Sequence, residues 1–189
     1  KLIEMLANPA ELSPEQKQSL SAYLEGVMKT PDPYNKSASK ALKGGASLTP
    51  AQKKGLEVLR SLSYKARDLD SVSEVVNRAA RVWTKIEKGE TVEAHEQLTL
   101  SELRQLKDIS AVANLLKPFA AAGLVFDTRV AKAQRVAEEA SSIIKKADAE
   151  LVVEAKSGDI IFYDLDRVES LTGQPLAKRE KVMRVLSPH

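Results

Sequence analysis

Apolar residues recur along most of this chain at alternating steps of three and four residues, which is the spacing of one face of an α-helix. The longest such series lies within 127–157, a stretch without glycine or proline. Its members are Val130, Ala133, Ala137, Ala140, Ile144, Ala147 and Leu151. Because a stripe of this spacing buries itself against other helices, and alanine lets a neighbouring backbone come close, the pattern predicts one long helix within a bundle.

Four helix starts are marked by capping boxes, in which Ser or Thr is followed three residues later by Gln or Glu. The four pairs are Ser13 with Gln16, Thr49 with Gln52, Ser71 with Glu74, and Thr99 with Glu102. With the apolar periodicity they predict helices near 2–8, 14–29, 50–69, 71–88, 100–117, 127–157, 160–171 and 175–186. No stretch alternates apolar and polar residues for long enough to predict a strand, so the predicted fold class is all-α, a multi-helix bundle of about six to eight helices.

Two stretches interrupt the helical pattern in the N-terminal third. The segment 30–35 contains two prolines, and because proline pushes its predecessor into an extended conformation we expect no helix there. Glycines at 44–45 permit a tight reversal. We therefore expect a single helical domain over 1–189, with loosely attached helices in 1–45 and the main bundle in 46–189, as a fragment of a larger protein.

Composition excludes some classes of chemistry. The chain has no cysteine, which removes disulfides, thiolate catalysis and cysteine-based zinc sites. With 43% hydrophobic and 29% charged residues, the composition is typical of a soluble globular protein. The longest uninterrupted apolar run, 119–126, is eight residues long, so we expect no transmembrane segment. Cytoplasm is the favoured compartment, with a secreted effector or a virion component left open.

Residues that could carry catalysis are few. The two histidines, His95 and His189, are far apart, and no glycine-rich phosphate loop is present. In the acidic group within 159–169, only Asp166 and Glu169 share a face of the predicted helix, which is too few ligands for Mg²⁺ or Ca²⁺. We therefore assign no catalytic residue, no metal site and no cofactor, and an enzyme is the least favoured class.

Charge is unevenly spread, although the formal net charge is only +3. Residues 35–88 carry twelve Lys or Arg against five Asp or Glu, whereas 89–175 carry ten against fifteen. The basic part is suited to phosphates or anionic lipid headgroups. Its candidate contact residues are Lys36, Lys40, Lys43, Lys53 and Lys54. Within 36–67 a single aromatic residue, Tyr64, is available to stack on a base.

The segment 115–126 is apolar, whereas connections between helices are normally polar. A proline and a glycine within it should end the preceding helix. Its apolar side chains either cap the core or form an exposed patch for a protein partner or a membrane interface. The candidate partner-binding residues are Phe119, Leu124 and Phe126, of which we expect Phe126 to be buried and Phe119 to be partly exposed.

Trp83 and Glu87 form a W-x-x-x-E pattern. These five residues resemble the signature of a family of bacterial effectors that act as guanine-nucleotide exchange factors on small GTPases. The resemblance implies an effector domain acting on a host GTPase. Trp83 also continues the apolar stripe of its predicted helix, which indicates a core tryptophan beside an exposed Glu87, and we assign the chain to no family.

The function expected from the sequence is a non-catalytic helical protein-interaction or scaffolding domain of a bacterial or phage protein. Its partner would contact a helix face or the corner at 119–126. The alternative is a helical module that binds a membrane surface or nucleic acid through the basic region 36–67. The effector domain is the weaker alternative.

Overall fold

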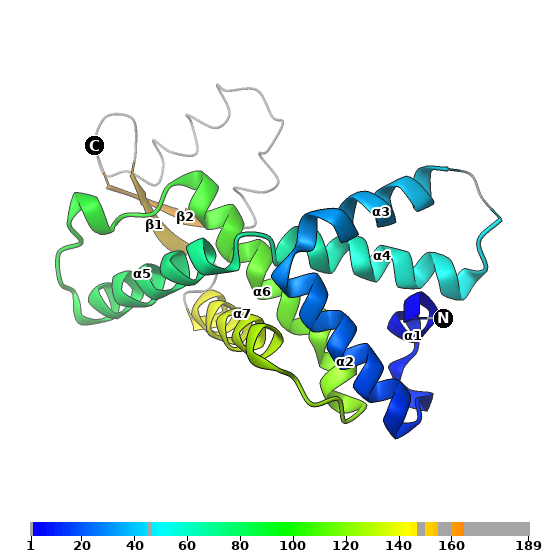
Figure 1. The fold of residues 1–189 in the computed structure, drawn as a ribbon. Coiled ribbons are helices and arrows are strands. Elements are labelled where there is room, and N and C mark those ends of the chain that lie inside the picture. The colour runs from blue at the N-terminus through cyan, green and yellow to red at the C-terminus, as the bar shows by residue number, and fades with distance from the viewer. Residues whose placement is uncertain (1, 45–46, 147–149, 155–159, 165–189) are drawn as a thin grey trace. The chain divides into compact units, whose positions relative to one another are not determined.

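The structure, a computed structural model, describes residues 2–44, 47–146, 150–154 and 160–164. Seven α-helices dominate this part of the chain (Figure 1), which confirms the predicted helical fold class. The helices are α1 (Leu2–Ala7), α2 (Pro14–Lys29), α3 (Pro31–Lys43), α4 (Pro50–Lys65), α5 (Leu69–Lys88), α6 (Leu100–Ala121) and α7 (Thr128–Lys146). Two 3₁₀ helices, η1 (Pro9–Glu11) and η2 (Ala94–Glu96), and two strands, β1 (Glu150–Glu154) and β2 (Ile160–Asp164), complete the described elements.

Internal contacts group the chain into two compact units. Unit 1 comprises Lys1–Leu69 and Asp108–Glu138, and unit 2 comprises Asp70–Lys107 and Glu139–His189. Helices α1 to α4 belong to unit 1, and all of α5 except its first residue belongs to unit 2. Helices α6 and α7 each contribute residues to both units. The single domain expected over 1–189 stays a prediction.

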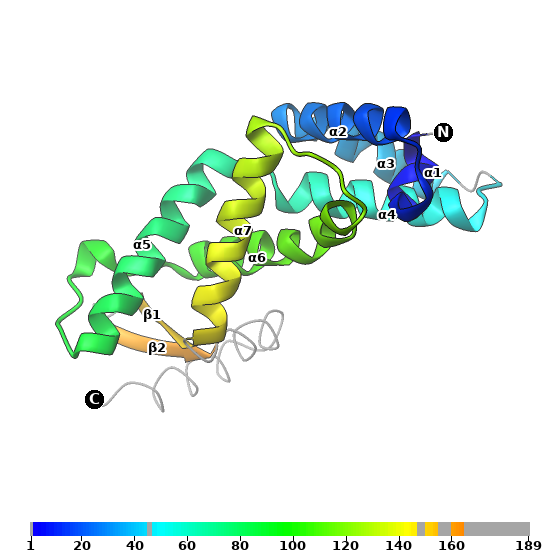
Figure 2. The same ribbon diagram turned by 90° about the horizontal axis from the view of Figure 1, so that it is seen from below.

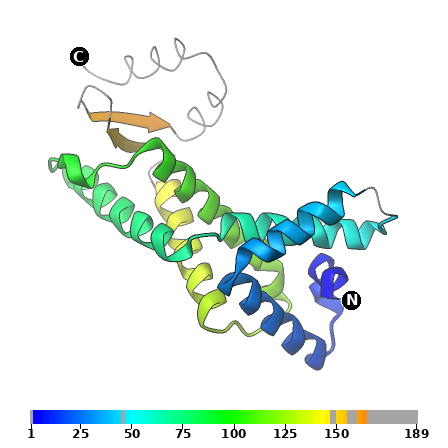
Figure 3. The same cartoon turned by 45° about the horizontal axis from the view of Figure 1, so that its top comes forward.

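In unit 1, α3 and α4 lie side by side as a helical hairpin, and α1 packs against α4 (Figures 1 and 3). The buried residues of α2, α3 and α4 are mostly aliphatic and none is aromatic, in keeping with an aromatic content of only 4% in the chain. They include Leu20, Leu24, Val27, Met28, Ala38, Leu56, Leu59 and Leu62. Helix α1 lies close to α4 at Gly55, where an added Cβ would lie 1.8 Å from the carbonyl oxygen of Ile3.

The prediction that 30–35 is not helical is wrong, because α3 begins at Pro31. Pro31 and Pro33 both lie in its first turn, where the N–H that proline lacks would have no acceptor within the helix. Thr30, just before the helix, takes the extended φ of −137° that a residue before proline prefers. The two prolines therefore start a helix here.

The long helix predicted at 127–157 is shorter in the structure, because α7 ends at Lys146. Beyond it, β1 and β2 pair as an antiparallel hairpin with Val152 opposite Phe162. The helix predictions for 150–154 and 160–164 are therefore wrong. The two segments are rich in valine, isoleucine and aromatic residues, which favour strands, and runs this short do not show a period that separates strand from helix.

Other C-terminal predictions lie outside the described residues. These are the helix at 175–186, the end of the helix at 160–171, and the acidic positions 159, 166 and 169.

Three of the four predicted capping boxes are present. Ser13, Thr49 and Thr99 each accept a hydrogen bond from the backbone N–H three residues on, and each donates its own N–H to the side chain at that position. The box at Ser71 is wrong, because α5 begins at Leu69 and Ser71 lies inside the helix. Leu69 is buried, so the core already includes the residue that opens the helix.

The start of α7 lies beside α2 (Figure 2) and is capped by a carboxylate from that helix. Glu25 accepts the backbone N–H groups of Arg129 at 3.0 Å and Val130 at 3.1 Å, and the hydroxyl of Thr128 donates to it at 3.2 Å. Burial by itself raises the pKa of Glu25, but these hydrogen bonds outweigh burial, and the pKa lies below its ordinary value.

Candidate functional site

All five lysines predicted to contact an anionic partner are exposed on α3 and α4. They are Lys36, Lys40, Lys43, Lys53 and Lys54, and we call them the lysine surface. Lys40 and Lys43 lie in the last turn of α3, and Lys53 and Lys54 lie near the start of α4. Because α3 and α4 are joined by 44–49, these four lysines lie near the same end of the hairpin.

Counter-charge is scarce on the two helices that carry the lysine surface. None of its lysines forms an ion pair with a described residue, and neither do Asp32 and Glu57, the two carboxylates of α3 and α4. One lysine of the hairpin that lies outside the lysine surface is paired: Lys65 lies 3.7 Å from Asp108. Lys53 and Lys54 also lie near the positive end of the α4 dipole, where cations are unfavourable. No ion pair with a described residue therefore stabilises the lysine surface, although Lys40 and Lys43 lie at the negative end of the α3 dipole, where cations are favourable.

The excess charge of unit 1 is confined to this hairpin. Helices α3 and α4 carry seven Lys or Arg against two Asp or Glu. The rest of unit 1 carries eight of each kind. The hairpin is thus a localised positive region on a unit that is otherwise balanced.

Two hydrogen bonds from Asn35 hold α3 against α4. The side-chain amide of Asn35 donates to the carbonyl oxygen of Arg60 at 3.0 Å and to the hydroxyl of Ser63 at 3.2 Å. Ser63 is buried and in turn donates to the carbonyl of Leu59 at 2.6 Å. These bonds, together with the aliphatic contacts of the hairpin, fix the two helices that carry the lysines.

The apolar corner at 119–126 is a helix-ending motif. Gly123 has a φ of +85°, and its N–H donates to the carbonyl of Ala120 at 3.0 Å. The N–H of Leu124 donates to the carbonyl of Phe119 at 3.1 Å. This pair of bonds defines a Schellman motif, which commonly brings together apolar side chains at the positions of Phe119 and Leu124. The apolar character of the corner thus follows from how α6 ends.

The three candidate residues of the corner differ in exposure. Phe119 is 1% exposed and Leu124 is 7% exposed, so both belong to the core of unit 1. The expected partial exposure of Phe119 is wrong, because α6 continues through Pro118 to Ala121 and keeps this side chain on its inner face. Phe126 is half-buried.

Large apolar side chains are scarce on the described surface. Val125 of the corner is 81% exposed, and Tyr64 of α4 is 52% exposed, with the guanidinium of Arg67 5.0 Å from its ring centre. No other large hydrophobic side chain is exposed in the part of the chain that the structure describes.

A groove of about 580 Å³ lies in unit 1 between the α1–η1 segment, α4 and α6. Leu6, Val58 and Phe119 contribute apolar side chains to its lining, and small residues such as Ala10 and Ala121 leave it open. Three polar side chains also line it, from Asn8, Lys54 and Asn114. The sequence did not predict this groove, because its lining comes from three distant segments and no motif links them.

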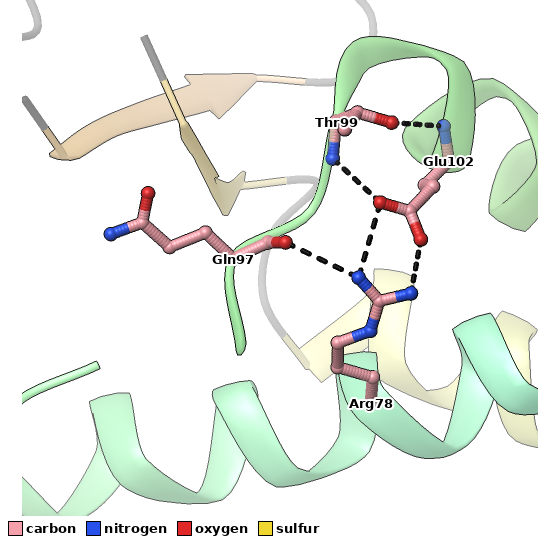
Figure 4. Close-up of polar contacts among 4 residues, drawn as sticks. All are labelled: Arg78, Gln97, Thr99 and Glu102. Atoms are coloured by element: carbon pink, nitrogen blue, oxygen red, sulfur yellow. Dashed lines mark hydrogen bonds and ion pairs between the residues drawn. The ribbon is translucent and has the colours of Figure 1, made fainter. Parts of the chain in front are cut away.

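In unit 2, an ion pair ties α5 to the start of α6 (Figure 4). Arg78 donates to both carboxylate oxygens of Glu102 and, at 3.3 Å, to the carbonyl oxygen of Gln97. Burial raises the pKa of Glu102, but the N–H of Thr99 and the guanidinium of Arg78 outweigh burial and hold it below its ordinary value. Glu102 also closes the Thr99 capping box. The cluster therefore has a structural role, because it connects α5 to the start of α6.

The W-x-x-x-E pattern lies on α5. Trp83 is half-buried and Glu87 is exposed. The indole Nε1 of Trp83 is buried without a hydrogen-bond partner among the described residues. Beside Trp83, Val82 packs with Val92 and Ile86 in a small apolar cluster of unit 2.

The described residues contain no group of three or more His, Asp or Glu side chains that could hold a metal ion. His95 is exposed on η2. None of the described helices is both long enough and apolar enough to cross a membrane. No family model, curated protein or solved structure matches the chain.

Proposed function

We propose that this chain is a non-catalytic helical module that binds the acidic surface of a protein partner through the lysine surface on α3 and α4. The observation that carries the proposal is that five exposed lysines gather on one helical hairpin without an ion-pair partner among the described residues. Like charges held together in this way oppose folding, so an external counter-charge is the natural source of their stabilisation.

Surface chemistry favours a protein over a membrane as the partner. A helical element that lies in a membrane interface inserts large apolar side chains below its cationic face. The only large apolar side chain exposed on α3 and α4 is Tyr64, and Arg67 lies over its ring. The hairpin is therefore suited to a polar surface.

The choice of cation favours a protein over nucleic acid. Arginine is favoured where a phosphate is bound by two parallel hydrogen bonds, because its planar guanidinium binds two oxygens at once, whereas lysine acts as a point charge. Six of the seven cations on α3 and α4 are lysine. Without a platform of aromatic residues for bases, these lysines match carboxylates spread over a protein surface. Such docking is fast and weakens as salt increases.

The proposal is tested by capture from an extract of the source organism that has been treated with nuclease. The test variant combines Lys36→Gln, Lys40→Gln and Lys43→Gln, which remove three charges from the exposed face of α3. We expect the immobilised wild-type chain to retain a partner that elutes with salt, and the variant to bind it at least about tenfold more weakly.

The matched control combines Lys88→Gln, Lys145→Gln and Lys146→Gln. These exposed lysines lie in the last turns of α5 and α7, as Lys40 and Lys43 lie in the last turn of α3, so the control has the same net charge and largely similar helix-dipole effects. We expect it to bind like the wild type. Equal loss in both variants, or binding only to duplex nucleic acid or anionic vesicles, would overturn the proposal.

A further inference from the structure

The groove in unit 1 has the size and lining of a small-molecule site. Its volume of about 580 Å³ falls within the range of about 300–1,000 Å³ that is usual for ligand pockets. Val58, Leu115 and Pro118 are partly or fully exposed and give it an apolar lining that a hydrocarbon chain could contact. Leu6 and Phe119 are 3% and 1% exposed, so they support this lining from the core of unit 1 and offer little surface of their own.

The polar side chains of the groove indicate which head group such a chain would carry. Lys54 is the only charged residue in the lining, and no carboxylate faces it there. Asn8 and Asn114 add side-chain amides, which can donate hydrogen bonds to an oxygen atom. A cation with two amide donors beside an apolar groove is complementary to a carboxylate on a hydrocarbon chain.

We propose that this groove binds a medium-chain carboxylate, with its head group at Lys54 and its hydrocarbon chain along Val58, Leu115 and Pro118. Binding is then driven by burial of methylene groups and oriented by the charge. Each added methylene should tighten binding by about threefold to fourfold until the groove is full. The site is independent of the proposed partner surface, with which it shares only Lys54.

The experiment is a titration of the ¹⁵N-labelled chain with decanoate below its micelle concentration, followed by amide chemical shifts. We expect saturable shifts in the side-chain amides of Asn8 and Asn114 and in the backbone at Lys54. Octanoate should bind about tenfold more weakly than decanoate because it is two methylenes shorter. Acetate and decyltrimethylammonium should not produce these shifts, since one lacks the chain and the other carries the wrong charge.

Two variants test the assignment with the fold kept intact. Lys54→Gln should weaken decanoate binding about threefold to fivefold, whereas Lys53→Gln, its exposed neighbour outside the lining, should not change it. Ala121→Trp adds bulk at an exposed position of the lining and should abolish binding while the melting temperature stays near that of the wild type.

No saturable shift in the groove with decanoate would overturn the proposal. So would equal binding by the Lys54 and Lys53 variants, or undiminished binding by a folded Ala121→Trp variant. If the proposed partner binding by the lysine surface is wrong, decanoate binding and its dependence on chain length are unchanged, so the two proposals fail in distinguishable ways.

Discussion

At the scale of single residues, two helical glycines differ in whether the structure has room for a side chain. Gly55 lies where α1 crosses α4, and an added Cβ would be 1.8 Å from the carbonyl oxygen of Ile3 and 2.7 Å from its carbonyl carbon. Both are backbone atoms, so the clash can be relieved only by moving a helix. Gly26 of α2 would instead place a Cβ 3.1 Å from the hydroxyl of Tyr34, a side chain that can shift.

We therefore expect Gly55→Ala to lower the free energy of unfolding by about 1–3 kcal/mol or to detach α1 from α4. Gly26→Ala should be neutral or stabilising, because alanine is favoured over glycine inside a helix by about 1 kcal/mol. Urea unfolding of both variants measures the difference. Equal stabilities would mean that α1 does not pack on α4 as described.

Residue exposure could be predicted from the sequence only in part. The exposed lysines followed from their charge, and Val130, Ala133, Ala137 and Ala140 are all fully buried, as their spacing predicted. Phe119 was not predictable, because a proline one residue earlier usually marks the end of a helix and here it does not.

At the scale of elements, the start of α7 depends on Glu25 of α2, more than a hundred residues earlier. The carboxylate supplies acceptors for two of the N–H groups that a helix start leaves without partners. Its pKa lies below the ordinary value of 4.5 because those hydrogen bonds favour the charged form. The stabilisation is therefore complete above about pH 5 and is lost as the pH falls through the lowered pKa.

We expect Glu25→Gln to lower the free energy of unfolding by about 1–2 kcal/mol at pH 7, with the difference from wild type shrinking as the pH falls from 5 to about 3. Urea unfolding at several pH values measures this. Glu138→Gln, at an exposed position of α7, is the control and should change stability by less than about 0.5 kcal/mol. A difference that did not depend on pH would contradict a charged cap at Glu25.

Element boundaries were predictable where the signal is local. The capping boxes at Ser13, Thr49 and Thr99 place three helix starts correctly, because each box is closed within four residues. Helix α3 was missed because its prolines also fit a turn, and β1 and β2 were missed because a short apolar run fits both helix and strand. The cap of α7 by Glu25 was not predictable, because no sequence pattern links residues that are more than a hundred positions apart.

At the scale of the whole molecule, the two units differ in formal net charge. Unit 1 has a formal net charge of +5 and unit 2 of −2, and the excess of unit 1 equals that of α3 and α4 alone. The sequence could show that the basic region exists, but not that its lysines lack partners, because pairing depends on which carboxylates folding brings near. The groove beside Lys54 was likewise invisible before its three segments were assembled.

The most direct test of the lysine surface is a zero-length cross-link. A water-soluble carbodiimide joins a lysine amine to a carboxylate only when the two are in contact, and the linked peptides can be mapped by mass spectrometry. In an extract of the source organism, we predict links from Lys40, Lys43, Lys53 or Lys54 to aspartate or glutamate of one partner protein, diminishing as salt is raised. Links confined to lysines outside α3 and α4, such as Lys117 or Lys146, would contradict the account.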